Sequence, residues 1–206
     1  MRIGVIADTH CPEFLDELPE AVFERLRGCQ LILHAGDVSG PEALEKLRRL
    51  APVEAVRGDH DRALPDLPRV RVLEIEGRQV ALVHGNRSRL LEEPVTFIGT
   101  ITLGLLWPNP GLHRWLRRRF PKADVIVYGH THNPVVDAAG GALVFNPGAV
   151  YQTDRAAALR RLRRRPNWFE WSWLQVIRHR RRVAAPTVGV LEIGPAGIRA
   201  EVLPLG

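Results

Sequence analysis

The chain has 206 residues, of which 45% are hydrophobic and 25% are charged, and its formal net charge is +6. These values fit one globular domain, or two at most, and exclude a disordered chain, a collagen and a disulfide-rich scaffold. With only two cysteines, Cys11 and Cys29, and no signal-peptide pattern at the start, we expect a cytoplasmic protein in a reducing compartment. The longest charge-free apolar stretch, residues 94–107, is shorter than the roughly 20 residues of a membrane-spanning helix, so no such helix is expected.

The first sixty residues alternate between strand and helix patterns. Short apolar runs at residues 2–7, 31–34 and 53–56 are typical of strands, and the segments 19–27 and 41–50 between them are typical of helices. Strands that alternate with helices predict βαβ units and a parallel sheet in this part of the chain.

The pattern changes in the rest of the chain. Residues 69–76 and 78–83 alternate in character on either side of Glu76-Gly77, which predicts a hairpin. A second hairpin is expected where Gly194-Pro195-Ala196-Gly197 separates two apolar runs. The remaining expected elements are a helix over 112–120 and strands over 124–128, 135–136, 142–145, 188–193 and 198–203.

Five polar clusters follow predicted strands directly. They are Asp8-Thr9-His10, Gly36-Asp37, Gly58-Asp59-His60-Asp61, His84-Gly85 and Gly129-His130-Thr131-His132. In α/β proteins, functional groups gather at the carboxyl ends of strands. A spacing of two residues in an extended segment puts both side chains on one face. This spacing separates Asp8 from His10 and His130 from His132.

A metal site is the interpretation that these clusters favour. For any one cluster alone, a loop histidine with satisfied hydrogen bonds is the simpler explanation. Five clusters in order, each after a strand, indicate a shared site. Mixed nitrogen and oxygen ligands suit Mn, Fe, Zn or Co, and two metals ~3.5–4 Å apart can hold both oxygens of a phosphoryl transfer.

The ordered clusters resemble those of the calcineurin-like metallophosphoesterases, in particular the compact phosphodiesterases of bacteria and archaea. Asn133-Pro134 and Asn146-Pro147-Gly148-Ala149 extend the match, which covers residues 1 to about 150 and resumes near Pro186. The resemblance implies an α/β fold, a four-layer αββα sandwich of two mixed β-sheets flanked by helices. We expect it to form a single domain over residues 1–206.

By position, the resemblance implies two divalent metal ions. Asp8, His10 and His132 would hold the first, Asp59, His84 and His130 the second, and Asp37 would bridge both. A hydroxide between the metals would attack phosphorus in line. Mn²⁺ is the expected ion, with Fe²⁺, Zn²⁺, Ni²⁺ and Mg²⁺ as alternatives.

Two further residues receive catalytic roles from the resemblance. His60 would protonate the leaving oxygen or contact the phosphate of the substrate. Asp61 would orient His60 or a nearby loop. The Asn146-Pro147-Gly148 segment would form a structural turn close to the site.

Asp59 departs from the family pattern, which usually has asparagine at this position. A third carboxylate lowers the net positive charge of the loaded site. We therefore expect tighter metal binding, a weaker pull on an anionic phosphate and a less acidic bridging water. A different preferred metal is a second interpretation, and a third is that Asp59 is not a ligand.

Residues 151–182 form a basic, tryptophan-rich insertion that holds ten arginines and two acidic residues. Helices are expected over 156–165 and 168–182, with Trp168, Trp171 and Leu174 at helical spacing on one face. The simplest interpretation is a helical hairpin packed on the body with a solvated arginine face. The alternatives are a lid, a nucleic-acid-binding surface, an anionic-membrane contact and a contact in a homo-oligomer.

In the lid interpretation, arginines of the insertion, Arg164 and Arg165 among them, would bind phosphate oxygens of the substrate.

The basic helix expected over residues 112–120 has two interpretations of its own. It would be a core-packing helix with a solvated face or a wall of the substrate pocket.

Together these features predict a dinuclear-metal-dependent phosphoesterase that hydrolyses phosphodiesters, with a phosphoester small molecule or a nucleotide as substrate. The first alternative is a nuclease or nucleic-acid-associated phosphoesterase. The second is a weakly active or inactive binding scaffold of the same fold, since the family resemblance includes a eukaryotic trafficking subunit of that kind. The third is a hydrolase of a lipid-linked pyrophosphate.

Overall fold

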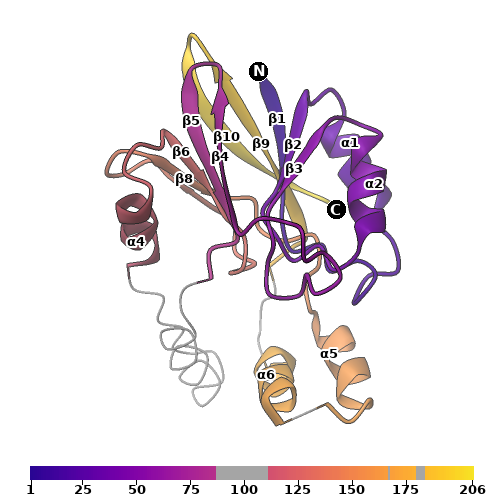
Figure 1. Cartoon of the computed structure of the whole chain (residues 1–206). Helices are drawn as coiled ribbons and strands as arrows, with labels where there is room; N and C mark the ends of the chain where they lie inside the picture. Colours follow the sequence, from indigo (N-terminus) through magenta and orange to yellow (C-terminus); the bar gives the residue numbers. More distant parts are fainter. Residues whose placement is uncertain (87–110, 167, 180–183) are drawn as a thin grey trace. The chain divides into compact units, whose positions relative to one another are not determined.

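The computed structural model describes residues 1–86, 111–166, 168–179 and 184–206 (Figure 1). Contacts divide the chain into two compact units. The first unit comprises Met1–Gly85, His113–Tyr151 and Ala185–Gly206, and the second comprises Asn86–Leu112 and Gln152–Ala184. The apolar stretch 94–107 lies outside the described residues. Within the described ranges, no helix has the length and apolar character needed to cross a membrane.

The first sheet of the first unit has the strand order β10-β9-β1-β2-β3. Its three N-terminal strands are parallel, and α1 and α2 connect them, so the predicted βαβ units are confirmed. β9 and β10 pair antiparallel, which confirms the C-terminal hairpin. The bounds are β1 Arg2–Ile6, α1 Glu20–Leu26, β2 Leu31–His34, α2 Pro41–Arg48, β3 Val53–Ala55, β9 Thr187–Gly194 and β10 Gly197–Pro204.

The second sheet has the order β4-β5-β6-β8-β7, with both parallel and antiparallel pairs. The predicted hairpin between β4 and β5 is confirmed, and its turn residues Glu76 and Gly77 both have positive φ, at 49° and 71°. This is the left-handed pair that a tight hairpin turn requires. The bounds are β4 Val70–Ile75, β5 Arg78–Val83, α4 Leu112–Arg119, β6 Val125–Val127, β7 Val135–Asp137 and β8 Leu143–Asn146.

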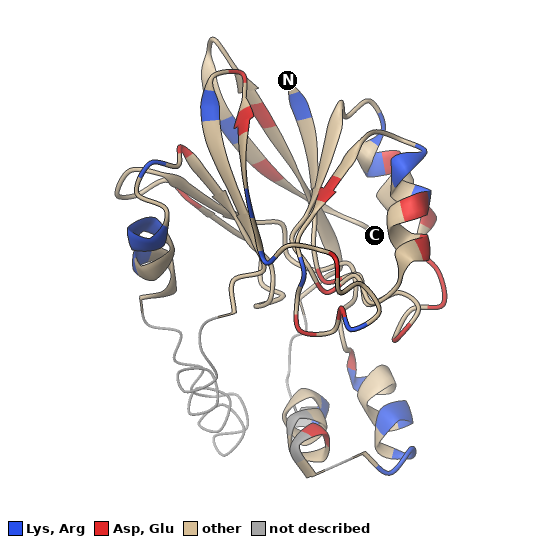
Figure 2. Cartoon of the chain, viewed as in Figure 1, with Lys and Arg blue, Asp and Glu red and all other residues tan. Residues whose placement is uncertain are grey.

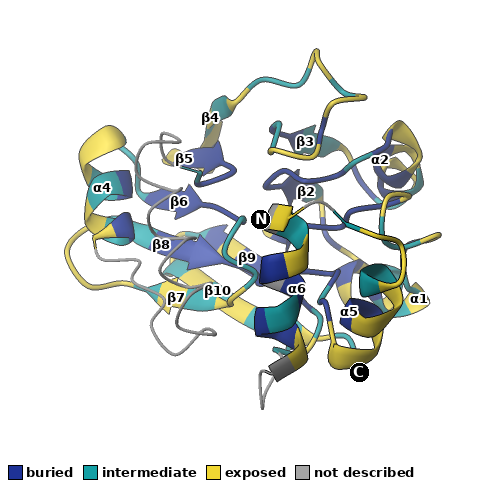
Figure 3. Ribbon diagram, turned by 90° about the horizontal axis from the view of Figure 1, so that it is seen from below, coloured by how far each residue is buried: buried dark blue, intermediate teal, exposed yellow. Residues whose placement is uncertain are grey.

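The two sheets stack with helices on their outer sides, which confirms the predicted sandwich of two mixed sheets (Figures 1 and 3). Strand alternation builds the layers. Ile3 and Val5 of β1 lie in the core between the sheets, whereas Ile6 lies in the core beneath α1 and α2. Gly4 faces α1, where a Cβ atom would lie 3.0 Å from Cδ2 of Leu26, so the missing side chain lets this helix pack closely.

The second unit contains α5, Arg155–Leu162, and α6, Trp168–His179. The Asp154 carboxylate accepts a hydrogen bond from the Ala157 N–H at 2.6 Å and caps the start of α5. A small apolar cluster that includes Leu174 and Ile177 joins the two helices. A salt bridge of 2.7 Å between the side chains of Arg161 and Glu170 links them further.

The insertion therefore forms the two helices that the sequence predicts, with differences at their ends. α5 stops at Leu162, three residues before the predicted end, and residues 180–182 of the second predicted helix lie outside the described residues. The predicted apolar face of α6 is divided, because Leu174 packs against α5 whereas Trp168 and Trp171 are exposed. Figure 2 shows arginines along α5.

Candidate metal centre

The polar residues of the first unit converge where five strands end, at the carboxyl ends of β1, β2, β3, β5 and β6. Groups of three ligand atoms lie within 4.8 Å of one another. The Asp8 group consists of Asp8, His10 and His132, and the Asp59 group consists of Asp59, His84 and His130. Asp37 forms two more groups, one with Asp8 and His84 and one with His10 and His60.

These groups bring together all seven residues that the sequence assigns to two metals. The grouping also follows the predicted division into two ligand sets, with Asp37 between them.

The backbone of the ligands differs from the extended geometry that the sequence predicts. Asp8, His10, Asp37, His130 and His132 all have positive φ, at 51°, 47°, 54°, 66° and 55°. This left-handed conformation is costly for residues with a side chain, by roughly 1–2 kcal/mol each. Asp8 and His10 still join one ligand group, through a tight turn rather than along a strand, whereas His130 and His132 belong to different groups.

Hydrogen bonds hold these turns in place. The Asp8 N–H donates to the Gly36 carbonyl at 3.0 Å, and the His10 N–H donates to the Asp37 carbonyl at 3.0 Å. The His130 N–H donates to the Asp8 carboxylate, with 3.0 Å to Oδ2. The loops after β1, β2 and β6 therefore fix one another, which compensates for the strained backbone.

Two glycines permit this close packing of loops. A Cβ on Gly58 would overlap the carboxylate and the backbone nitrogen of Asp37. A Cβ on Gly129 would lie 2.8 Å from Cβ of Ala7 and 2.9 Å from Oδ2 of Asp8. Any side chain at either position would push the ligand loops apart.

Asp61 is fully buried and accepts three hydrogen bonds from backbone N–H groups. Asp37 donates at 2.9 Å, Ser39 at 2.7 Å and Gly58 at 2.6 Å. Of the two predicted positions for Asp61, the structure places it against the loops after β2 and β3 rather than against the His60 ring.

Asn146, at the end of β8, fixes the loop that carries His130 and His132. Its Nδ2 donates to the Gly129 carbonyl at 2.9 Å and to Oγ1 of Thr131 at 3.0 Å. Its Oδ1 accepts from the Gly148 N–H at 2.8 Å. The segment is therefore a turn beside the site, as the sequence predicts.

Burial and neighbouring charges set opposite pKa directions for the two buried carboxyl groups. Asp8 has no exposed area, and burial raises its pKa well above the usual value, with a further contribution from the charge of Asp37. For Asp37, burial also acts to raise the pKa, but the charge and close approach of the His84 ring and the charge of His10 lower it well below the usual value.

His84 is completely buried, and its tautomer follows from its hydrogen bond. Its Nδ1–H donates to the Ala35 carbonyl at 2.8 Å, so Nε2 is the nitrogen that faces Asp37, 3.4 Å from Oδ2. Burial opposes a charge on this ring, but the charge and close approach of the Asp37 carboxylate and the charge of Asp8 raise the pKa of His84 to about 10. Without metal, the ring therefore holds a proton among the carboxylates.

His34 shows the contrasting case of a buried histidine with both nitrogens satisfied. Its Nδ1 accepts from the Gly36 N–H at 3.3 Å, which leaves Nε2–H to donate to Oγ1 of Thr9 at 3.1 Å. Burial lowers the pKa of His34 to about 4. His34 is therefore a neutral support for the ligand loops, a role that its sequence position does not reveal.

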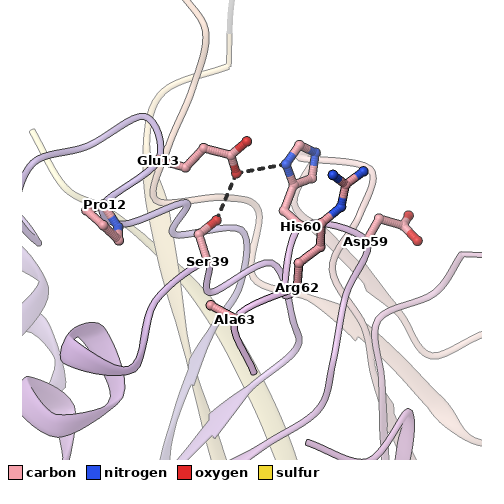
Figure 4. A pocket seen from close by; sticks show the side chains of 7 residues that line it. All are labelled: Pro12, Glu13, Ser39, Asp59, His60, Arg62 and Ala63. Atoms are coloured by element: carbon pink, nitrogen blue, oxygen red, sulfur yellow. Dashed lines mark hydrogen bonds and ion pairs between the residues drawn. The ribbon is translucent and has the colours of Figure 1, made fainter. Parts of the chain in front are cut away.

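A cavity of about 460 Å³ lies beside the ligand cluster (Figure 4). In it, the Nδ1–H of His60 donates to Oε2 of Glu13 at 2.8 Å, and Oγ of Ser39 donates to the same oxygen at 3.0 Å. Burial acts to raise the pKa of Glu13, but the His10 ring, whose Nδ1 lies 3.8 Å from Oε2, and the charge and hydrogen bond of His60 lower it to about 2. The residues that line the cavity are Pro12, Glu13, Ser39, Asp59, His60, Arg62 and Ala63.

Glu13 is a site residue that sequence reasoning missed. The available signal was its position three residues after His10, on the loop that follows β1. Arg164 and Arg165, which the sequence assigns to substrate binding, lie in the second unit and are exposed. Their role stays a prediction.

Comparison with known proteins identifies the family of these residues. The family model of the calcineurin-like phosphoesterase superfamily domain matches residues 1–160. A probable metallophosphoesterase from Methanothermobacter thermautotrophicus is 40% identical over 151 residues, which is 72% of this chain and 77% of the relative. A phosphodiesterase from Methanocaldococcus jannaschii is 24% identical over 163 residues, 72% of this chain and 83% of the relative.

Solved structures share the fold over nearly the whole chain. Wild-type Vps29 of Entamoeba histolytica, complexed with Zn²⁺, has a TM-score of 0.64 and 21% identity, with 100% of both chains covered. An archaeal phosphodiesterase has a TM-score of 0.56 and 19% identity, with 98% of this chain and 100% of the other covered.

Proposed function

The chain belongs to the calcineurin-like phosphoesterase superfamily, and on this premise we propose that it is a phosphodiesterase that requires two divalent metal ions. The observation that carries the proposal is the convergence of the Asp8 group and the Asp59 group, with Asp37 close to members of both. Neither the number of ions nor the substrate follows from family membership alone.

The residues present fit a pair of metal ions. Among the described residues, Nδ1 of His10 and Nε2 of His84 are buried nitrogens that have no hydrogen-bond partner. Because the other nitrogen of His84 is fixed by the Ala35 carbonyl, its Nε2 lone pair is available to a metal once the ring loses its extra proton. The donors are four imidazoles and three carboxylates, a mixed set that suits Mn²⁺, Fe²⁺ or Zn²⁺.

When bound, the ions would supply the positive charge that activates water and neutralises the phosphate. The chain's own groups supply the rest. Glu13 holds Nδ1–H of His60, so the Nε2 side of the ring is left to protonate the leaving oxygen or to contact the phosphate. The backbone N–H of His60 donates to Oδ1 of Asp37 at 2.8 Å. This bond fixes His60 relative to Asp37, the residue that lies close to members of both ligand groups.

A phosphodiester substrate is supported by relatives rather than by the geometry. The relative from M. jannaschii carries the name phosphodiesterase, and a solved archaeal neighbour is described in the same way. We propose Mn²⁺ as the activating ion, and the Zn²⁺ complex of Vps29 supports divalent-metal binding in this fold.

The test is hydrolysis of bis(4-nitrophenyl) phosphate and 4-nitrophenyl phosphate by metal-stripped protein, with Mn²⁺, Mg²⁺, Zn²⁺, Ni²⁺ and Fe²⁺ added back in turn. Metal content is measured alongside. We expect the diester to be cleaved faster than the monoester, with two ions bound and Mn²⁺ the most effective. Two bound ions without turnover would instead favour a binding scaffold of the same fold.

A second candidate function is a nuclease, and the second unit favours it. Trp168 and Trp171 are 69% and 47% exposed on α6, and Arg164 and Arg165 are exposed after α5. Exposed tryptophans stack on bases and arginines bind phosphates. Binding of a single-stranded oligonucleotide that falls steeply with salt, and falls again in the R164Q/R165Q variant, would support this function. Binding that is absent at low salt would exclude it.

A further inference from the structure

The cavity beside the ligand cluster contains one charged group that the proposed mechanism does not use. Arg62 lines the cavity together with Glu13, Asp59 and His60. The residue is exposed, and Figure 4 shows its guanidinium pointing to the same side as the His60 ring. The same cavity also holds two acidic side chains, Glu13 and Asp59.

The acidic side chains of the cavity are already engaged. Glu13 accepts hydrogen bonds from His60 and Ser39, and Asp59 belongs to a ligand group with His84 and His130. The guanidinium of Arg62, in contrast, forms no hydrogen bond or ion pair with the residues that the structure describes. Among the described residues that line the cavity, Arg62 is therefore a cation that is available to a ligand.

The base of Arg62 is held rigidly even though its side chain is exposed. Asp61, the preceding residue, accepts three backbone hydrogen bonds from the loops after β2 and β3. The backbone N–H of Arg62 donates to the His60 carbonyl at 3.0 Å. The side chains of His60 and Arg62 therefore both extend from one short, fixed segment of backbone. A substrate whose leaving oxygen reaches His60 would present the rest of its leaving group within the reach of Arg62.

We propose that Arg62 binds a second anionic group, a phosphate or carboxylate, on the leaving part of a phosphodiester substrate. The inference rests on the proposed function. The metal ions and their ligands would neutralise the scissile phosphate, which leaves Arg62 for an additional charge. A guanidinium binds such a group through two parallel hydrogen bonds. The preferred substrate class is thus a phosphodiester with a further negative charge, such as a phosphorylated dinucleotide.

The test compares the thymidine dinucleotide TpT with its 5′-phosphorylated form pTpT and its 3′-phosphorylated form TpTp. Cleavage of the internal diester by the Mn²⁺-loaded protein is followed by chromatography. We expect kcat/KM about tenfold higher for one phosphorylated form than for TpT. In Arg62→Gln this preference disappears, while turnover of TpT and metal content stay unchanged. Arg62→Lys retains part of the preference, because it keeps the charge but loses the paired donors.

Arg69→Gln is the matched control, since Arg69 is an exposed arginine that does not line the cavity. It should behave as the wild-type protein.

Equal kcat/KM on all three dinucleotides, or an equal loss on all three in Arg62→Gln, would overturn the inference. If the wild-type protein cleaves no diester, the proposed function fails. The role of Arg62 is then tested by measuring the equilibrium binding of the same dinucleotides. Weaker binding of the phosphorylated form by Arg62→Gln, with TpT unaffected, would then support it, and equal affinities would overturn it.

Discussion

The Asp8 group and the Asp59 group each hold one carboxylate and two imidazoles, but their carboxylates lie in different surroundings. Asp8 is completely buried and accepts a backbone hydrogen bond from His130. The Asp59 side chain is 49% exposed, and its Oδ2 lies 3.7 Å from Nδ1 of His130. Water therefore compensates the charge of Asp59, whereas the charge of Asp8 would depend on the protein and on the proposed metal ion.

This difference makes a carboxylate inexpensive at position 59, where the resemblance implies an asparagine. A further carboxylate among buried ligands would be costly, but at an exposed position its desolvation cost is small. We therefore expect changes to the shared or buried ligands to have large effects and changes at Asp59 to have small ones.

The largest effect should come from Asp37, because it lies close to ligands of both groups. Asp37→Ala removes a ligand from both proposed metals and also the acceptor of the His60 N–H. We expect loss of both ions and a fall in diester hydrolysis of at least about 10³-fold. Asp66→Asn, an exposed carboxylate on the loop after β3, is the control and should keep full activity. An Asp37→Ala protein with wild-type metal content would show that the ligand assignment is wrong.

The direct comparison of the two groups uses Asp8→Asn and Asp59→Asn, which make the same change at a buried and an exposed position. Asp8→Asn should lose one ion and about 10²-fold or more in kcat. Asp59→Asn should bind metal about tenfold more weakly and, at saturating metal, turn over at least as fast, because the site gains positive charge. Equilibrium dialysis with metal analysis, followed by kinetics at saturating Mn²⁺, measures both. Equal losses in the two variants would contradict the comparison.

An intermediate effect is expected from Glu13, which holds the His60 ring near the Asp8 group. Glu13→Gln keeps an acceptor for Nδ1–H but removes the negative charge. We expect a fall in kcat of roughly tenfold for a diester with a poor leaving group and a much smaller fall for a 4-nitrophenyl diester, which needs little protonation. The same fall on both substrates would indicate that Glu13 acts on the structure of the site and not through His60.

The smallest effect is the pH dependence of thermal stability. The folded-state pKa of His84, about 10, lies above its unfolded value of 6.5, so the stability from its bound proton is present below pH 6.5 and is lost as the pH rises toward 10. For His34, the folded-state pKa of about 4 lies below 6.5, so its contribution is present above pH 6.5 and is lost as the pH falls toward 4.

The Tm of the metal-free protein should therefore be highest near pH 6.5 and decline on both sides by a few degrees. With Mn²⁺ bound, His84 acts as a neutral ligand, and the decline above pH 6.5 should disappear. Scanning calorimetry of both forms from pH 4 to 10 measures this. A Tm of the metal-free protein that rises steadily from pH 6.5 to 9 would contradict the assignment.

The sequence predicted the parts of the molecule that follow from hydrophobic periodicity and from the spacing of polar residues. Strand and helix order follow from periodicity, and the ligand clusters follow from their positions at strand ends. It did not predict the left-handed backbone of Asp8 or His10, because hydrogen bonds from other loops stabilise that conformation. It also did not reveal Glu13 or His34, since their roles depend on which side chains the loops after β1, β2 and β3 bring together.

The central claim is that two metal ions lie among these ligands, and anomalous diffraction from crystals of the Mn²⁺-loaded protein tests it most directly. We predict two anomalous peaks, one next to the Asp8 group and one next to the Asp59 group, with Asp37 in contact with both. The second peak should weaken in Asp59→Asn while the first stays unchanged. A single peak, or peaks that lie away from Asp37, would contradict the claim.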